Sequence, residues 1–244
     1  MTVVLETEIF PISGSEVKLV LDTPAGLVHA TAECEHHKAT AVTLQNVPSV
    51  VILSDVETEE GIGRITSDIA YGGNFYAILP AEQAGVAIRL DQANTLVDTG
   101  RRIRAALNEY VGDRVVHPEN PGVRGVTHMM VTAEPTNPKT HKKNMVLYGP
   151  AAWTVPSAGR GTSARMAQMH FRGEVALNRE FVHESTIGSL FTRRLIGPAR
   201  KVGLFDAVVL TVKGSAYIMG IQQFLLDSED PFQKGFRLGQ GQPP

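Results

Sequence analysis

The chain has 244 residues, of which 43% are hydrophobic and 20% are charged, so it can bury a sizeable core in one large domain or two small ones. Its formal net charge of -2 excludes the strongly basic surface that recruits nucleic acid or an anionic membrane, and we expect neither partner. The single cysteine, Cys34, excludes an internal disulfide and gives no sign of an oxidising compartment.

The first part of the chain predicts a small β-rich unit. Residues 1–8 have no basic segment, and no apolar run approaches the ~20 residues of a membrane span, so we expect no export signal or anchor and a cytoplasmic protein. Residues 17–33 alternate around a Thr-Pro-Ala-Gly turn, which is typical of a β-hairpin. Short strands are predicted at 41–45 and 49–53, followed by an acidic loop at 57–61.

The middle of the chain combines strands with one amphipathic helix. Residues 67–80 predict a strand, a glycine break and a second strand, and a glycine pair at such a place indicates close backbone approach. Apolar positions recur every three or four residues over 91–111, which predicts a helix with Asp91 as its N-cap. A loop rich in proline and asparagine, 116–122, precedes a predicted strand at 125–132.

The last part predicts a strand, a helix and two closing strands. The strand is expected at 145–148 and the helix, rich in alanine and methionine, at 159–171, with Gly173 at its C-terminal end as a helix C-cap. The two closing strands are expected at 207–212 and 216–226.

Ten short motifs span nearly the whole chain in one order. Each motif alone is weak, but the set resembles the proline racemase family, especially its 4-hydroxyproline epimerase branch. The motifs are Leu21–Gly26, Asn46–Ser49, Asp68–Ala77, His117–Pro121, Gly125–His128, Gly161–Ala167, Arg172–Glu174, Phe181–Gly188, Asp230–Phe232 and Gly235–Gly239.

The resemblance implies an α/β (α+β) fold of the diaminopimelate-epimerase type. Such a fold has two pseudo-symmetric lobes, each with a mixed sheet around a central helix, and it binds the substrate between the N-termini of the two helices, where free N–H groups favour a carboxylate. On this comparison residues 47–214 form the second lobe, and residues 1–46 with 215–244 are the remnant of the first. We expect the first lobe to be incomplete, because the chain begins partway along what would be its central helix.

The resemblance also implies an isomerase that works without a cofactor. Family members move the Cα proton of proline or hydroxyproline between two cysteines, one on each central helix, and one acts as base while the other acts as acid. The first cysteine would precede Met1, and the second aligns with Ala158. Both catalytic thiols are therefore missing from the printed chain, and we predict that it is inactive. No metal site is implied.

The resemblance implies four further positions of the site, three in the stretch aligned with the second cysteine motif and one in Gly125–His128. Thr154 stands where the family has an aspartate that holds the substrate ammonium, and Arg160 replaces a threonine. Gly159 opens the helix, and His128 ends the Gly-Val-Thr-His motif, so we predict substrate contacts for all four. The expected ligand is a small amino acid of the proline or hydroxyproline type. The remnant strands would lack partners, which predicts self-association.

Two alternatives to an inactivated epimerase stay open. One is a non-catalytic binding protein that keeps the cleft and recruits a small amino acid or a partner subunit. The other is a relative of trans-3-hydroxyproline dehydratase, in which one cysteine is replaced by threonine. Ala158 provides no such hydroxyl, although Ser157 lies beside it.

The codons behind residues 153–158 suggest a cause for the lost cysteine. Shifting the reading frame to the last base of Trp153 permits codons for Asp-Arg-Ser-x-Cys, which restores four of five family residues. We interpret the stretch as the product of two compensating frame changes, either in a decaying gene or in the recorded sequence. A true divergence is the alternative.

Three remaining features admit a functional and a structural interpretation. Cys34, His36 and His37 form a Cys-x-His-His cluster that could bind zinc or copper, but no second ligand group lies at structural-zinc spacing, so we interpret it as a surface turn. His183 is either a structural histidine or a cleft residue. For Asp68 we favour a structural role over one as a cleft carboxylate.

Overall fold

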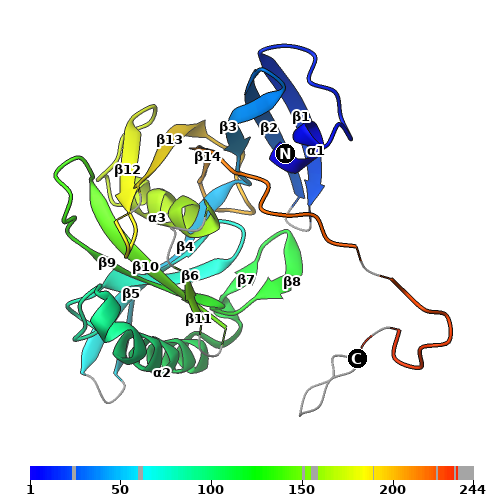
Figure 1. The fold of residues 1–244 in the computed structure, drawn as a ribbon. Coiled ribbons are helices and arrows are strands. Elements are labelled where there is room, and N and C mark those ends of the chain that lie inside the picture. The colour runs from blue at the N-terminus through cyan, green and yellow to red at the C-terminus, as the bar shows by residue number, and fades with distance from the viewer. Residues whose placement is uncertain are drawn as a thin grey trace.

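The protein is represented by a computed structural model that describes residues 1–23, 26–59, 63–149, 152–154, 159–188, 190–223, 225–233 and 235 (Figure 1). Its helices and strands, in chain order, are α1 (Thr2–Glu6), β1 (Glu16–Thr23), β2 (Gly26–Glu35), β3 (Lys38–Gln45), β4 (Ser49–Glu59), β5 (Arg64–Tyr71), β6 (Phe75–Pro80), η1 (Leu90–Gln92), α2 (Ala93–Val111), η2 (Gly112–Arg114), β7 (Val116–His117), β8 (Asn120–Arg124), β9 (His128–Ala133), β10 (Lys142–Tyr148), β11 (Ala152–Thr154), α3 (Gly159–Phe171), β12 (Glu180–Glu184), β13 (Leu190–Pro198) and β14 (Ala207–Gly214).

The main sheet closes into a barrel. Its strands follow the order β14-β13-β12-β10-β9-β6-β5-β4, and β4 pairs again with β14 through Val50 and Ala207. The β6–β9 and β10–β12 pairs are parallel, and the other neighbours in this circuit are antiparallel. The expected mixed sheet is therefore confirmed.

Helix α3 lies inside this barrel, as Figure 1 shows, and contacts β4, β5, β6 and β14. Residues 161–169 are all buried, so the helix has no solvent-facing stripe. Small side chains allow this enclosure: a Cβ at Gly161 would lie 3.0 Å from Met130 Cε and 3.2 Å from Tyr76 Cε1. The predicted helix over 159–171 is confirmed, and Gly173 follows it with a φ of 73°, as its C-cap role requires.

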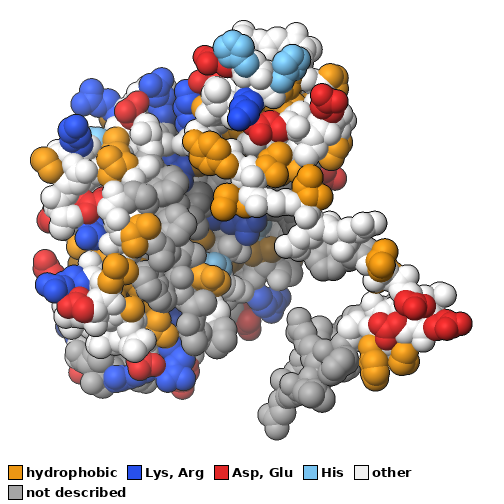
Figure 2. All heavy atoms as spheres, viewed as in Figure 1, with side chains coloured by type: hydrophobic (Ala, Val, Ile, Leu, Met, Phe, Trp, Pro, Cys, Tyr) orange, Lys and Arg blue, Asp and Glu red, His pale blue; other side chains and the backbone are white. Residues whose placement is uncertain are grey.

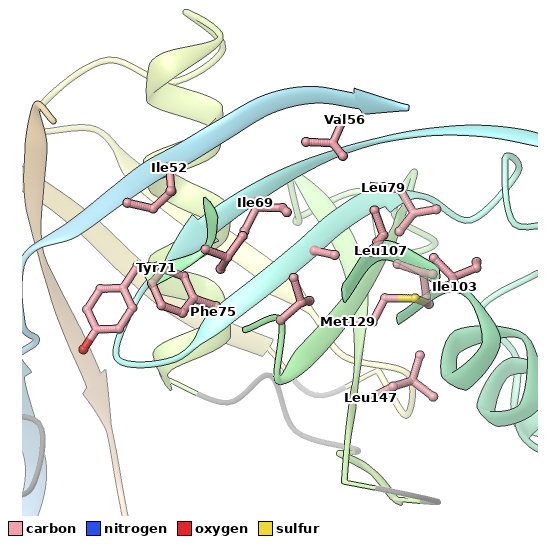
Figure 3. Packing of buried hydrophobic residues seen from close by; sticks show 14 of the residues in the cluster. Ile52, Val56, Ile69, Tyr71, Phe75, Leu79, Ile103, Leu107, Met129 and Leu147 are labelled. Atoms are coloured by element: carbon pink, nitrogen blue, oxygen red, sulfur yellow. The ribbon is translucent and has the colours of Figure 1, made fainter. Parts of the chain in front are cut away.

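The strands bury both faces, one against α3 and one against α2. In β6, Phe75 and Leu79 join the cluster shared with α2, whereas Tyr76 and Ile78 point into the barrel. Figure 3 shows the outer cluster, in which Leu107 and its α2 neighbours meet the sheet. Each large side chain buried in this way stabilises the fold by about 1.5–3 kcal/mol.

A separate three-stranded unit projects from the barrel. Strand β3 pairs with the C-terminal half of β14, and β2 and β1 continue the sheet outward. Helix α1 packs on β3. The unit has its own small core, which includes Leu5, Val17 and Cys34. The predicted hairpin over 17–33 is confirmed as β1 and β2. The division of the chain at residue 47 into two lobes stays a prediction.

The segment after β14 runs away from the body (Figure 1). Its described residues form no helix or strand, so the strand predicted over 216–226 is wrong. The apolar pattern is present, but within the described part of the chain no strand pairs with it. Figure 2 shows exposed hydrophobic and acidic side chains along this segment.

Other differences from the predicted elements have local causes. Strand β4 continues to Glu59, so the acidic loop expected from residue 57 is paired with β5 through bulges. The expected loop at 116–122 contains the β7–β8 hairpin. Asp91 does not cap α2, because a 3₁₀ turn precedes the helix, Gln92 takes the N-cap position, and Asp91 pairs with Arg89.

Candidate active site

A cavity of about 690 Å³ opens beside the start of α3. Its walls come from strands β1 and β2, residues 47–48, the β5–β6 turn, the β7–β8 hairpin, residues 200–202 and the first turn of α3. Two other cavities border the far half of α3 and the loop after it. Of these three cavities in the described part of the chain, the first lies at the N-terminal end of α3, where the helix dipole favours an anion, so we treat it as the candidate site.

The β5–β6 turn packs directly on α3. A Cβ at Gly72 would lie 2.4 Å from the Arg160 carbonyl oxygen and 2.5 Å from the Ala164 nitrogen, so a larger residue does not fit. Gly73 has a φ of 104°, and a Cβ there would lie 3.1 Å from Arg160 Cδ. The glycine pair therefore permits the close approach that the sequence predicted.

Asn46 ties these two elements together. Its Nδ2 atom donates to the Gly72 carbonyl oxygen at 3.2 Å and to Ser163 Oγ at 2.7 Å. One side chain, directly after β3, thus holds both the glycine turn and the first turns of α3. This role explains why an asparagine motif at 46–49 accompanies the glycine motif, a contact that no local sequence pattern predicts.

One ion pair lies on the cavity wall. Arg200 donates to Glu119 through both terminal nitrogens, at 2.5 and 2.8 Å. His117 lies near it, with its ring 4.6 Å from that of Tyr71. Burial and the charge of Arg200 lower the pKa of His117 despite the opposing effect of Glu119, so the ring is neutral at pH 7. Sequence reasoning missed Arg200 and Glu119, because 81 residues separate them.

Arg160 is the second residue of α3 and lines the cavity. Its side chain is exposed, and among the described residues no carboxylate forms an ion pair with it. The predicted contact with substrate thus falls on a residue that faces the cavity. Gly159 begins the same helix, and Thr154 ends β11 opposite Val146. Ala158 lies outside the described residues.

His128 lies at the start of β9, between two tyrosine rings. Its centroid is 4.7 Å from that of Tyr76 and 6.2 Å from that of Tyr148, and its Nδ1 is 2.8 Å from Thr127 Oγ1. Burial and the positive charges of Arg104 and Arg160 lower its pKa to about 4. His128 is therefore neutral at pH 7. It does not belong to the described lining of the cavity, and its contact with substrate stays a prediction.

His183 and Asp68 lie deeper in the barrel wall. His183 is fully buried, with Nδ1 3.4 Å from Thr162 Oγ1. Asp68 accepts hydrogen bonds from Arg172 and Gln168, near the C-terminal end of α3, so it is remote from the cavity at the helix start. The structural interpretation of Asp68 fits these contacts.

Cys34 is not in a surface turn. It lies in β2 with 5% of its surface exposed, and the turn follows at His36 and His37, whose φ angles are positive. The alternation of the strand continues one residue further than predicted, which turns the thiol into the small core beside Leu5. Within the described ranges, no group of three or more metal-ligating side chains is found.

The described helices include none that is both long and apolar enough to cross a membrane.

The family model for proline racemase matches residues 1–237. The chain is 42% identical over 238 residues to a 4-hydroxyproline 2-epimerase of Streptosporangium roseum, covering 97% of this chain and 70% of the relative. It is 37% identical over 258 residues to proline racemase A of Trypanosoma cruzi, covering 98% and 60%.

Solved structures agree with the sequence relatives. A hydroxyproline epimerase from Agrobacterium vitis with bound trans-4-OH-L-proline superposes with a TM-score of 0.87 at 35% identity, covering 97% of this chain and 67% of the other. A methylitaconate-delta-isomerase shares the fold with a TM-score of 0.55 at 12% identity. The chain belongs to the proline racemase family.

Proposed function

We propose that this chain binds a proline-type ring carboxylate at the start of α3 but does not exchange its Cα proton. The observation that carries the proposal is the alanine at position 158, where the family resemblance expects a catalytic thiol. The family reaction needs a base on one face of the carbon and an acid on the other. A methyl group can be neither.

The chain offers no substitute thiol at this place. Cys34 is its single cysteine, and it is buried in the projecting unit among Leu5, Val17 and their neighbours. Burial and the nearby charge of Glu6 raise its pKa, which disfavours the thiolate that proton abstraction needs. The loss of a proton-transfer group costs a factor of about 10²–10⁴ in rate.

Binding is supported separately from catalysis. The cavity lies at the start of α3, where helix N–H groups favour a carboxylate, and its glycine turn is held by Asn46. The similar structure from Agrobacterium vitis holds trans-4-OH-L-proline. A proline-type carboxylate is therefore the ligand class that we propose for this chain.

The test is Cα proton exchange in deuterium oxide, followed by proton NMR. With the unmodified 244-residue protein, we expect the Cα proton signal of L-proline or trans-4-hydroxy-L-proline to decay no faster than in the uncatalysed reaction. Ala158→Cys alone should not restore exchange, because Cys34 is too deeply buried to supply the opposite-face acid or base. Ala158→Ser is the matched control.

Exchange by the unmodified chain, or full rescue by Ala158→Cys, would show that two thiols are not required and would refute the proposed loss of activity. Circular dichroism of every variant verifies that an inactive sample is folded.

A further inference from the structure

We infer that the cavity selects ring carboxylates that carry a net negative charge over zwitterionic amino acids, and that Arg160 is the residue that sets this preference. The inference rests on the proposed function, because it assumes that the cavity beside α3 is the ligand site. It goes beyond that function by assigning the charge class of the ligand.

Arg160 lies on the cavity wall, with its stem against the glycine turn. Its aliphatic stem lies across Gly73, where a Cβ would be 3.1 Å from Cδ, 3.2 Å from Cγ and 3.6 Å from Nε. The glycine leaves room for the stem, and Arg160 is an exposed residue that lines the cavity. Burial raises the pKa of Tyr71 and Tyr76, and the positive charge of Arg160 opposes the rise at both rings. The guanidinium is thus within electrostatic reach of these rings.

The other charges of the cavity cancel. Glu119 is the carboxylate on the described lining, and both of its oxygens accept hydrogen bonds from Arg200. His117 is neutral at pH 7, because burial lowers its pKa. On the described wall the charge of Arg160 therefore stays unbalanced, and no carboxylate is free to hold a ligand ammonium.

The helix adds to this imbalance. The N-terminus of α3 carries the positive end of the helix dipole, so a cation at its second residue is unfavourable in the absence of an anion. A carboxylate between the helix N–H groups and the guanidinium relieves the repulsion and gains charge-assisted hydrogen bonds. The ammonium of a zwitterion would instead meet like charge.

Three ring ligands of nearly equal size separate charge from shape. At pH 7 cyclopentanecarboxylate carries a charge of about -1, L-proline is a zwitterion of zero net charge, and L-prolinamide is not anionic at any site. Isothermal titration calorimetry on the unmodified protein should give the tightest binding for cyclopentanecarboxylate and the weakest for L-prolinamide. We expect a preference of about tenfold for the anion over L-proline, as one charge-assisted hydrogen bond provides.

Arg160→Gln should remove most of this preference, and Arg160→Lys should keep part of it, because lysine retains the charge but not the planar fork. Arg102→Gln is the matched control, since Arg102 is an exposed residue of α2 that does not line the cavity. It should leave the preference unchanged.

The possible outcomes are distinguishable. Tighter binding of L-proline than of cyclopentanecarboxylate overturns the inference and leaves the proposed function standing. An equal loss of preference in Arg102→Gln assigns the effect to the overall charge and removes Arg160 from its role. If a folded chain binds neither carboxylate, the proposed function fails, and the inference fails with it.

Discussion

At the scale of single residues, Asp68 fixes the end of α3 opposite the candidate site. Its carboxylate accepts hydrogen bonds from Arg172 at 2.6 and 3.1 Å, from Gln168 at 2.7 Å and from the Asp55 nitrogen at 3.0 Å. Burial raises the pKa of Asp68, but the hydrogen bonds from Arg172 and Gln168 outweigh this effect, and the pKa is lowered. The ionised carboxylate fixes the C-terminal end of α3 against β5. Because the helix is rigid, this contact also helps to fix the position of its N-terminal end at the candidate site.

The lowered pKa of buried His183 predicts that the protein becomes less stable as the pH falls. Burial, followed by the charges of Arg165 and Arg193, lowers its pKa from 6.5 to about 3. Between these values the unfolded chain binds a proton that the folded chain does not, so the free energy of unfolding falls as the pH falls, by about 1.4 kcal/mol per pH unit. Denaturant unfolding at pH 6.5 and pH 5 should therefore show a loss of about 2 kcal/mol from this residue.

His183→Gln provides the comparison, because glutamine fills similar space and does not titrate. Each variant is compared with itself at the two pH values, so the general cost of the substitution cancels. The variant should lose about 2 kcal/mol less than the native chain on acidification. The same loss in both chains would mean that the buried imidazole is not the titrating group.

At the scale of elements, the β5–β6 turn controls where α3 begins. Gly72→Ala would put a methyl carbon against the backbone of Arg160 and Ala164, which cannot move as a side chain can. We expect a loss of stability of about 1–3 kcal/mol and weaker binding of ring carboxylates, because the helix start must shift. Thermal unfolding and calorimetry measure the two effects.

The control for this substitution is Gly214→Ala at the end of β14. Nothing lies within 4 Å of a Cβ at Gly214, and its φ is not positive. This variant should keep native stability within about 1 kcal/mol. Equal melting temperatures for Gly72→Ala and the native chain would contradict the packing argument.

Local patterns predicted the elements of the site better than the sheet around it. The alanine-rich helix at 159–171 and the glycine break between two strands are short-range features, and both are confirmed. Strands β12 and β13 were not predicted, because their place depends on neighbours such as β10 that lie far away in the sequence. The Arg200–Glu119 ion pair was not predicted for the same reason, because its two residues lie far apart in the sequence.

At the scale of the whole molecule, the segment after β14 leaves hydrophobic side chains in solvent. Tyr217 is 82% exposed, Met219 95%, Ile221 89% and Leu225 87%. Strand β1 adds an edge of the sheet without a neighbour on its outer side among the described strands. An apolar segment and an open edge in one molecule favour association between copies.

We expect the purified chain to self-associate as its concentration rises, which size-exclusion chromatography with light scattering measures. The double variant Ile221→Lys, Leu225→Lys should shift the equilibrium toward the monomer. The variant Gln222→Lys, Gln223→Lys adds the same charge to exposed polar positions and should shift it less. A monomer at all concentrations, or equal shifts in the two variants, would count against association through the apolar side chains.

The closure of the barrel also bears on the order of folding during synthesis. Helix α3 is translated before β12, β13 and β14, yet those strands complete the wall that encloses it. The last pairing joins Val50 to Ala207, two positions far apart in the chain, and such long-range contacts slow folding. Strands β4, β5 and β6 can cover part of α3 early, but Met166 and Met169 pack on residues of β12, β13 and β14. Until β14 leaves the ribosome this face of the helix lacks its cover, and we expect the nascent chain to bind chaperones at that stage.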